Sequence, residues 1–569
     1  MREKEGKKTS PPTKGKPRPK RAAPNAVTKR RTEPTAKPKP RPKPEPKPKR
    51  KPKTPPPTKP ELSAKLSVRP PAPRPEVVAP SGPAPRTLGY ALDAMHGTWV
   101  GPPAAEVEFA GAAADSRRVG PGVLFFALPG ERVDGFDFCA AAATAGAAAV
   151  VIDGRRGQPA FAAGGPRVPV IGVRDPLTAL ADLARAVRAD FAGAVVGITG
   201  SNGKTTTKEL TAAALGAAGP VLRTEGNYNT EVGLPLTILS SSGQEAFWVL
   251  EMAMRGRGQI ALLADIARPH VGVITNVAGA HVELLGSIEE VARAKGELFA
   301  GLGPEGVAVL PAGDRLIEPQ AAHVPEGLKW RFDPGPAAAP PLGAPVSVTS
   351  DVRILDIVPA GVAGQVVRYA VANQPVVARL PLGGQHNAVN AGAALAVAAA
   401  LDVPAPEAAA ALARTRLPPH RSAPVEVGGR IVLDDCYNAN PASMRAALTA
   451  VGAAAAGGNG ARAFAILGDM LELGPEAAAE HRAIGRVART LAGLVAVGPL
   501  AAEIARGARE AGLAGGQVVA TTDPAAAAAA IAGWTRPGDW ILVKASRGMR
   551  LERAIDALRE EFRLRPAMT

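Results

Sequence analysis

The sequence has little cysteine, few aromatic residues and no long apolar run. Only two of its 569 residues are cysteine, and Phe, Trp and Tyr make up 4% of the chain. Two cysteines as far apart as Cys139 and Cys436 exclude a disulfide framework. The N-terminus lacks the apolar segment of a secretory signal, and Ala-rich runs such as 139–152 are too short and too weakly hydrophobic to span a bilayer. We therefore expect a cytoplasmic protein without a membrane span.

Positive charge is concentrated at one end of the chain. The formal net charge is +17, but residues 1–86 hold 26 of the 68 Lys and Arg and only 6 of the 51 Asp and Glu. The rest carries 42 basic against 45 acidic residues, which argues against a nucleic-acid-binding fold. Because residues 1–86 are rich in Lys and Pro and poor in apolar residues, we predict a disordered extension. This extension either contacts anionic partners or is simply solvated.

A glycine-rich segment between a strand and a helix is the most informative motif. Residues 194–199 form a short β-branched apolar run typical of a buried strand, and a helix is predicted from about Lys204. Free N–H groups and the dipole at such a helix start favour phosphate. Lys204 would reach the β- and γ-phosphates of ATP, and Thr205 would bind Mg²⁺. The strict pattern has glycine where Ile198 stands, which leaves a chance match as the alternative. The predicted ATP site comprises Gly200, Ser201, Asn202, Gly203, Lys204, Thr205 and Thr206.

Predicted strands and helices alternate from about residue 87 onward. This alternation predicts an α/β protein with mostly parallel sheets. Residues 346–358 and 364–382 instead resemble antiparallel strands. The predicted division is an extension at 1–86, a small α/β domain at 87–174, a central P-loop ATPase-like domain with a parallel sheet at 175–421, and a C-terminal Rossmann-like domain at 422–569.

Three polar residues follow the phosphate loop in the predicted central domain. Glu251 and His281 come after apolar runs that begin at residues 247 and 271, and Lys295 lies in a helix-like segment. Ligands collect outside the C-terminal ends of parallel strands. Glu251 is therefore a candidate ligand for Mg²⁺, which prefers oxygen donors. Each of these residues taken alone is more often solvated than functional, so their order after a phosphate loop is what indicates a site.

Motifs in all three predicted domains are similar to those of a known family. Those of the central domain are GITGSNGKTTTKE (197–209), LEMAMRGRGQI (250–260), ITNVAGAHVELLGS (274–287), ARAKGELF (292–299) and HN (386–387). With these motifs the chain resembles the Mur ligases, the ATP-dependent amide-bond ligases of peptidoglycan precursor synthesis. Residues 115–138 resemble the UDP-binding domain that the last two ligases of the series share. Three C-terminal segments resemble the last ligase: 433–448, 467–474 and 543–552.

The resemblance implies a reaction and its cofactors. The last ligase joins D-alanyl-D-alanine to UDP-N-acetylmuramoyl-tripeptide through an acyl phosphate and gives UDP-N-acetylmuramoyl-pentapeptide. The implied cofactors are ATP and Mg²⁺, and a monomer is expected. The resemblance also implies domain roles. The domain at 87–174 would bind the UDP-precursor, and the two following domains would complete the Mur ligase architecture.

The resemblance also implies roles for individual residues. Lys204, Lys295, His281, Arg421 and Asp435 would be catalytic, with Asn387 near the adenine, Arg421 at the γ-phosphate and Asp435 at the ribose or orienting the site. The implied metal ligands are Thr205, Glu251, His281 and a carbamylated Lys295, for which a plain lysine facing phosphate is the alternative. The implied substrate-binding residues are Asp115, Ser116, Arg117, Asn229, Thr230, Tyr437, Asn438, Asn440, Lys544, Ser546 and Arg547.

Four other interpretations explain less of the sequence. The preceding ligase would need a DNPR-like loop, and the C-terminal third has YNANP instead. A folylpolyglutamate synthase would lack the UDP-binding domain. A nucleic-acid-associated ATPase would leave the DSR and YNANP segments unexplained, and a binding-only relative would not need Lys204, Glu251 and Asp435. Two departures from the family, Ala253 and Cys436, replace one small residue by another.

Overall fold

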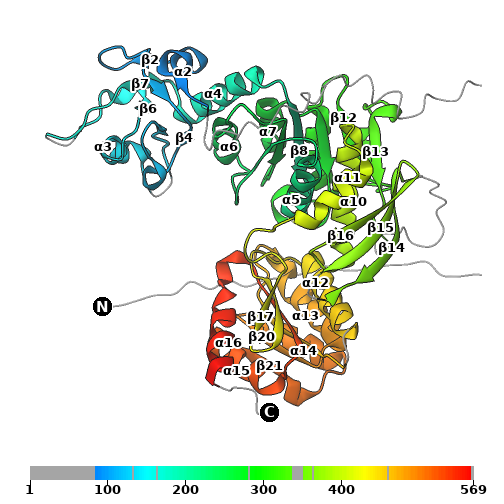
Figure 1. Cartoon of the computed structure of the whole chain (residues 1–569). Coiled ribbons are helices and arrows are strands. Elements are labelled where there is room, and N and C mark those ends of the chain that lie inside the picture. Colours follow the sequence, from blue (N-terminus) through cyan, green and yellow to red (C-terminus); the bar gives the residue numbers. More distant parts are fainter. Residues whose placement is uncertain are drawn as a thin grey trace, which may run out of the picture. The chain divides into compact units, whose positions relative to one another are not determined.

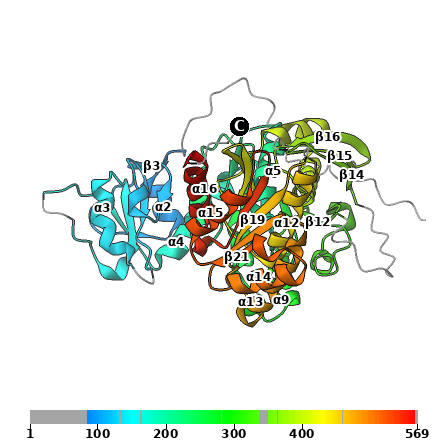
Figure 2. The ribbon, with the colours of Figure 1, turned by 90° about the horizontal axis from the view of Figure 1, so that it is seen from below.

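The structure is a computed structural model of the chain (Figures 1 and 2). Of the predicted extension, only residues 84–86 are described, and they belong to the fold. Arg86–Thr87 form strand β1, which pairs with β3 (Glu108–Phe109), and Ala84 N–H donates to Ser241 O at 2.8 Å. The folded chain therefore begins at least three residues earlier than the sequence suggests. The described residues are 84–564 without 131–132, 162–163, 280–281, 336–349, 362–363 and 458–459.

A five-stranded sheet forms the N-terminal part of the described chain. Its strands lie in the order β2-β7-β6-β5-β4, parallel except for β2. Phe125, Val150 and Ile152 face Cys139 and Ala142 of helix α3 on one side, while Phe126 and Val151 face helix α4 on the other. The elements are α2 (Leu88–Ala94), β2 (Thr98–Trp99), β4 (Ala112–Ala113), β5 (Leu124–Phe126), α3 (Cys139–Thr144), β6 (Ala149–Asp153), β7 (Val170–Val173) and α4 (Pro176–Asp190).

A nine-stranded sheet follows, in the order β16-β15-β14-β13-β12-β11-β8-β10-β9. The strands from β9 to β14 are parallel, and β14 to β16 are antiparallel, which confirms the antiparallel prediction for the described part of those segments. The strands are β8 (Ala194–Thr199), β9 (Val221–Arg223), β10 (Phe247–Glu251), β11 (Val271–Ile274), β12 (Val307–Pro311), β13 (Lys329–Phe332), β14 (Val352–Pro359), β15 (Gln365–Val371) and β16 (Gln374–Leu380).

Helices cover both faces of the nine-stranded sheet because its parallel strands are apolar on both sides. Val196 and Ile198 of β8 face one helix layer, and Val195 faces the other. The first layer is α5 (Lys204–Leu215), α10 (Gln385–Ala400) and α11 (Ala405–Ala411). The second is α4, α6 (Gly233–Leu239), α7 (Gln259–Ala267) and α9 (Ile288–Ala300), and the short helix α8 (Val282–Leu285) precedes α9.

Helix α4 shares one hydrophobic core with both of these sheets. Asp175 caps its N-terminus by accepting a hydrogen bond from Thr178 N–H, and Pro176 occupies the first turn. Leu183 and Val187 are buried in a core cluster that includes Val151 of the five-stranded sheet and residues of β8, β10 and β11. The two sheets are therefore joined through apolar packing as well as through the chain.

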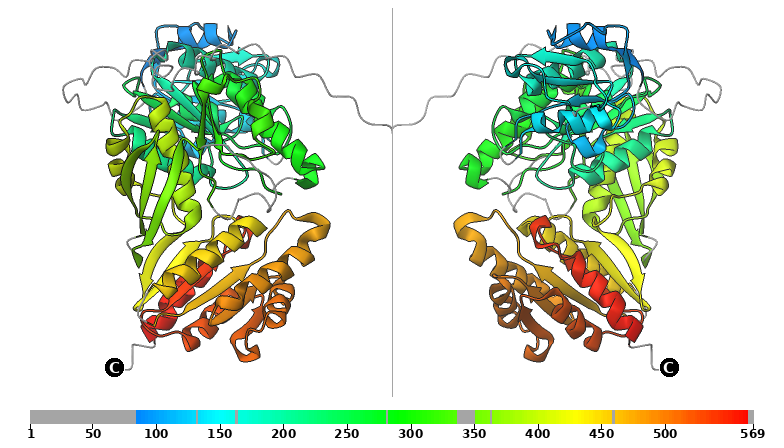
Figure 3. Two further views of the ribbon diagram at one scale, coloured as in Figure 1. Left: turned by 90° about the vertical axis from the view of Figure 1, so that its right-hand side faces the viewer. Right: turned by 90° about the vertical axis from the view of Figure 1, so that its left-hand side faces the viewer.

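A six-stranded sheet forms the C-terminal part, in the order β17-β18-β22-β19-β20-β21, with only β17 antiparallel (Figure 3, yellow to red). Helices α12, α13 and α14 share one core cluster with it, and α15 and α16 share another. The strands are β17 (Ala423–Val427), β18 (Arg430–Asp435), β19 (Ala463–Gly468), β20 (Gly493–Val497), β21 (Val518–Thr521) and β22 (Trp540–Lys544). The helices are α12 (Pro441–Ala456), α13 (Ala477–Val487), α14 (Ala501–Glu510), α15 (Pro524–Trp534) and α16 (Glu552–Leu564).

No helix in the described ranges combines the length and the hydropathy needed to cross a bilayer. The domain boundaries at 174/175 and 421/422 stay predictions.

Both cysteines are free and buried, so we expect them to resist modification in the native protein. Burial raises the pKa of Cys139 to about 11, and burial together with Asp434 raises the pKa of Cys436. Because the thiolate is the reacting species, a raised pKa leaves few of these thiols in the reactive form at pH 8. A thiol reagent such as dithionitrobenzoate should label neither cysteine in the folded protein and both in denaturant. Rapid stoichiometric labelling of the folded protein would contradict these environments.

Candidate active site

The phosphate loop lies between β8 and α5, in the middle of the parallel strands. Two of its residues must be glycine. Gly200 has φ +151°, and a Cβ there would lie 1.9 Å from Thr275 Oγ1. Gly203 has φ +79°, and its Cβ would lie 2.6 Å from Asn390 Oδ1. The loop therefore runs close to β11 and α10 and leads into the free N–H groups at the start of α5, an arrangement suited to phosphate.

Lys204 folds back over this loop. Its Nζ donates to Gly200 O at 2.7 Å and to Ser201 O at 3.3 Å. Burial lowers the pKa of Lys204, Arg421 lowers it further, and Glu251 opposes the shift. The half-buried ammonium group thus lies in a place where an anion would stabilise its charge.

A buried carboxylate meets the helix of the phosphate loop. Glu251, 2% exposed at the end of β10, accepts a hydrogen bond from Thr205 Oγ1 at 2.8 Å and one from Asn229 Nδ2 at 2.8 Å. Its backbone N–H donates to Thr224 Oγ1 at 2.9 Å. A hydroxyl and a carboxylate side by side are the donors that Mg²⁺ prefers, and Mg²⁺ completes its shell with phosphate and water. The residues present therefore fit magnesium.

Lys295 is buried on α9, with 2% of its surface exposed. Burial lowers the pKa of Lys295 well below its ordinary value, and the charge of Lys204 lowers it further. The shift makes the uncharged, nucleophilic amine more accessible than in an exposed lysine. His281, the third predicted residue of this set, lies outside the described residues. Within the described chain, no group of three His, Cys, Asp or Glu side chains could hold a metal by itself.

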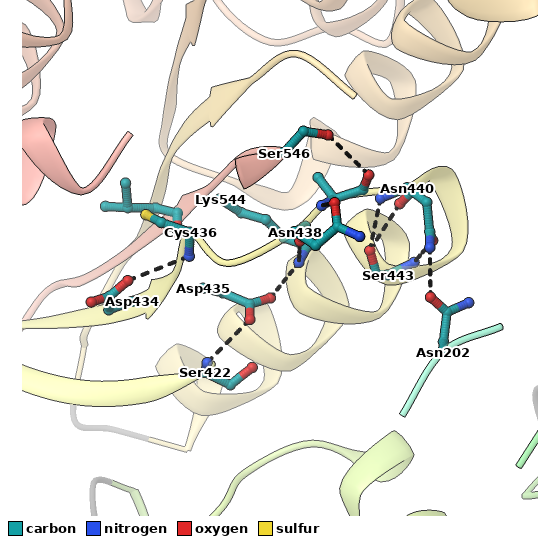
Figure 4. A network of polar contacts seen from close by, with 12 residues as sticks. Asn202, Ser422, Asp434, Asp435, Cys436, Asn438, Asn440, Ser443, Lys544 and Ser546 are labelled. Atoms are coloured by element: carbon teal, nitrogen blue, oxygen red, sulfur yellow. Dashed lines mark hydrogen bonds and ion pairs between the residues drawn. The ribbon is translucent and has the colours of Figure 1, made fainter. Parts of the chain in front are cut away.

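A second polar network lies at the C-terminal edge of the six-stranded sheet (Figure 4). Asp435 at the end of β18 pairs with Lys544 at the end of β22 at 2.6 Å, and Lys544 Nζ also donates to Asn438 O at 2.8 Å. Ser546 Oγ donates to Ala439 O at 3.2 Å and accepts from Leu471 N–H at 2.9 Å. The YNANP loop (residues 437–441) is thus held in place by residues at the neighbouring strand ends. Asp435 Oδ1 additionally accepts from Ser422 N–H at 3.1 Å.

Arg421 and Asn387 occupy different positions around the site. The guanidinium carbon of Arg421 lies 3.7 Å from the centre of the Tyr437 ring, a cation–π contact, and Arg421 Nε has no hydrogen-bond partner among the described residues. Asn387, 2% exposed in the first turn of α10, donates to Gly383 O at 2.8 Å. A cavity of about 760 Å³ lies beside this turn, and its lining includes Asn276 and Ser422.

The residues predicted to hold the UDP end lie on the five-stranded sheet. Asp115 caps the turn at Ser116–Arg118, and Arg117 Nη2 pairs with Asp115 Oδ2 at 2.7 Å. Arg118 donates a hydrogen bond to Tyr228 Oη and its guanidinium carbon lies 4.9 Å from the ring centre. Since Tyr228 precedes Asn229, this contact connects the turn at Ser116–Arg118 with the loop that contacts Glu251.

Among the described residues, the side chains of some predicted site residues make no hydrogen bond to these polar networks. Arg547 pairs with Glu552 at 3.1 Å, and its side chain is 54% exposed. Thr230 is exposed and accepts a backbone hydrogen bond from Leu234 as α6 begins. Thr206 follows Thr205 in the first turn of α5.

Comparisons with known proteins find relatives across the chain. The family model for the Mur ligase middle domain matches residues 198–398. The model described as Mur ligase, glutamate ligase domain, matches 420–547, and the one described as Mur ligase family, catalytic domain, matches 108–188.

Similarity to individual proteins extends over most of the chain. A UDP-N-acetylmuramoyl-tripeptide--D-alanyl-D-alanine ligase of Mycobacterium leprae is 37% identical over 494 residues, which cover 79% of this chain and 93% of the relative. The chain belongs to the Mur ligase family. The protein of the same name from Synechocystis is also 37% identical to this Mur ligase and covers 79% of it, with 91% of the relative aligned. The predicted family is thereby confirmed.

Solved structures confirm the expected three-domain Mur ligase architecture for this Mur ligase. MurF from Acinetobacter baumannii superposes with a TM-score of 0.72 at 28% identity and covers 84% of this chain and 99% of its own. MurF from Thermotoga maritima in complex with ADP superposes with a TM-score of 0.67 at 28% identity, covering 80% and 98%.

Sequence reasoning missed several residues that shape the site of this Mur ligase. Thr275 and Asn276 fix the phosphate loop, Thr224 fixes the backbone of Glu251, and Arg118 contacts Tyr228. Asn276 carried a signal, since it follows an apolar strand as Glu251 does. Arg118 stands beside the predicted Arg117, and only the fold shows which of the two arginines faces Tyr228.

Proposed function

We propose that this Mur ligase joins D-alanyl-D-alanine to UDP-N-acetylmuramoyl-tripeptide at the expense of ATP and gives UDP-N-acetylmuramoyl-pentapeptide. The observation that carries the proposal is the hydrogen bond at the phosphate loop between the Thr205 hydroxyl and the buried Glu251 carboxylate. The relatives named for this reaction and the MurF structure with ADP support it.

The chemistry requires activation of a carboxylate. In this proposal the terminal carboxylate of the tripeptide takes the γ-phosphoryl group of ATP and becomes an acyl phosphate. The free amine of D-alanyl-D-alanine attacks the acyl carbon, and phosphate leaves as the amide forms. The enzyme's part is positioning and charge neutralisation. Lys204 and Arg421 supply positive charge, and exclusion of water protects the acyl phosphate.

Thr205 and Glu251 are the residues that would hold Mg²⁺ together with phosphate oxygens. The ion would offset negative charge on the transferring phosphoryl group. His281 would join this set. Lys295 as a carbamate would offer oxygen donors for a second ion, because CO₂ adds to the uncharged amine with release of a proton and gives an anion.

The remaining residues are assigned to the substrates. Asp115, Ser116 and Arg117, with Asn229 and Thr230, would bind the precursor. Asn387 and Asp435 would contact the nucleoside beside the cavity of about 760 Å³. The dipeptide would bind at Tyr437, Asn438, Asn440, Lys544, Ser546 and Arg547. Because ATP and UDP-linked precursors are cytoplasmic metabolites, we place a monomeric enzyme in the cytoplasm. Contacts of residues 1–83 with anionic partners stay a prediction outside the described residues.

Phosphate release tests the proposal directly. The purified protein is mixed with ATP, Mg²⁺ and UDP-N-acetylmuramoyl-tripeptide, with and without D-alanyl-D-alanine, and the product is weighed by mass spectrometry. We expect release only with the dipeptide and a product heavier by one dipeptide unit. Turnover with a single amino acid and the UDP-dipeptide precursor would instead assign the preceding ligase. Turnover only with nucleic acid would support an ATPase.

A further inference from the structure

Two asparagine side chains join the phosphate loop to the YNANP loop (Figure 4). Asn440 Nδ2 donates to Asn202 Oδ1 at 2.6 Å, across 238 positions of sequence. Asn202 lies in the phosphate loop between β8 and α5, and Asn440 lies in the YNANP loop after β18. The bond forms only when these two loops are adjacent, so it reports their relative position.

The backbone of Asn202 is held from the other side. Asn202 N–H donates to Asn276 Oδ1 at 3.0 Å, and Asn276 Nδ2 donates back to Asn202 O at 3.0 Å. Thr275 Oγ1 donates to the same oxygen at 2.6 Å. The backbone N–H and C=O of Asn202 are thus both hydrogen-bonded to Thr275 and Asn276, which follow β11 of the nine-stranded sheet. The side-chain amide is the part of Asn202 that reaches the YNANP loop.

Asn440 uses the two halves of its amide for different purposes. Its side-chain Oδ1 accepts a hydrogen bond from Ser443 N–H at 2.9 Å, and the backbone N–H of Asn440 donates to Ser443 Oγ at 3.0 Å. These two bonds cap α12. Its Nδ2 contacts Asn202. Serine or aspartate could replace the cap, but neither has an amide N–H₂ to donate. The amide N–H₂ is therefore what distinguishes asparagine from the other favoured N-cap residues at this position.

We propose that Asn440 is a positioning residue that couples binding of the dipeptide to binding of the nucleotide. The identity of the two ligands rests on the proposed function. A dipeptide that holds the YNANP loop next to the phosphate loop favours the Asn202–Asn440 bond and with it the nucleotide-binding arrangement. The same coupling must act in the reverse direction. One hydrogen bond between neutral groups corresponds to about a fivefold change in affinity.

The test uses the full chain with UDP-N-acetylmuramoyl-tripeptide present. Calorimetry gives the Kd of a non-hydrolysable ATP analogue with and without D-alanyl-D-alanine. In the unmodified enzyme the dipeptide should tighten nucleotide binding about fivefold. Asn440→Ser keeps an N-cap and removes the donor, so this factor should fall to about one. Because Asn440 is also assigned to the dipeptide site, the Kd of D-alanyl-D-alanine is measured for each variant, and nucleotide binding is compared at saturating dipeptide.

Two further variants separate coupling from folding. Ser443→Ala weakens the cap but leaves the Asn440 amide, so it should lower thermal stability and keep the coupling. Asn202→Ala combined with Asn440→Ser should lose no more coupling than either change alone. Full coupling in Asn440→Ser, or losses that multiply in the double variant, would overturn the inference. An unmodified enzyme with dipeptide-dependent turnover but no coupling would also overturn it, whereas absence of that turnover would count against the proposed function.

Discussion

Replacing Lys204 by alanine should reduce turnover about a thousandfold, the loss seen when a preorganised charge at a transferring group is removed. Lys204 is half-buried, folds over the phosphate loop and has a pKa that is lowered by desolvation, so its charge is poorly solvated before a phosphate arrives. The γ-phosphoryl group would supply the missing counter-charge. Steady-state phosphate release measures the loss, and calorimetry with UDP-N-acetylmuramoyl-tripeptide should show nearly unchanged precursor binding.

The neighbouring Lys208 provides a matched control. It is fully buried on the same helix, pairs with Glu209 at 2.9 Å and donates to Thr224 O. Lys208→Ala would leave a buried carboxylate without this partner and should lower the unfolding temperature. Lys204→Ala removes a desolvated cation and should leave that temperature unchanged or higher. Near-normal turnover in Lys204→Ala would refute the assignment of the phosphate loop.

Lys295→Ala should lose about a hundredfold or more in turnover and regain part of it with added short carboxylic acids. Burial lowers the pKa of Lys295 and so favours the uncharged amine, the form that adds CO₂, more than in an exposed lysine. A small carboxylate would then replace the carbamate oxygens in the space that the side chain leaves. The measurement is turnover against acid concentration at fixed pH and ionic strength.

The same acids should not restore Lys204→Ala, since that variant lacks a cation. This comparison distinguishes occupation of the Lys295 site from a general salt effect. Restoration of Lys295→Ala by small primary amines, with none by acids, would establish a plain lysine that faces phosphate.

The strand, loop and helix around Lys204 could be predicted because each has a local cause. Residues 194–199 are apolar and β-branched, and β8 has these bounds. Two glycines are required by steric contacts with Thr275 and Asn390. Glu251 could be proposed because strand ends meet at one edge of a parallel sheet.

Partners in other strands and loops could not be predicted in the same way. Asn229 was assigned to the precursor and contacts Glu251, while Asn202 and Asn440 were assigned to different ligands and contact each other. These pairings depend on strand order and on how loops meet, which no local pattern specifies. Arg547 stands in a motif, yet in the structure it pairs with Glu552.

The shared packing of α4 has a consequence for cooperativity of unfolding. Leu183 and Val187 are buried in a cluster that includes residues of both the five-stranded and the nine-stranded sheet, whereas the six-stranded sheet has clusters of its own. Separating the first two sheets would expose apolar surface on each, which couples their stabilities. We therefore expect the five-stranded and the nine-stranded sheet to unfold together, so that the proposed binding region for the UDP end would not fold by itself.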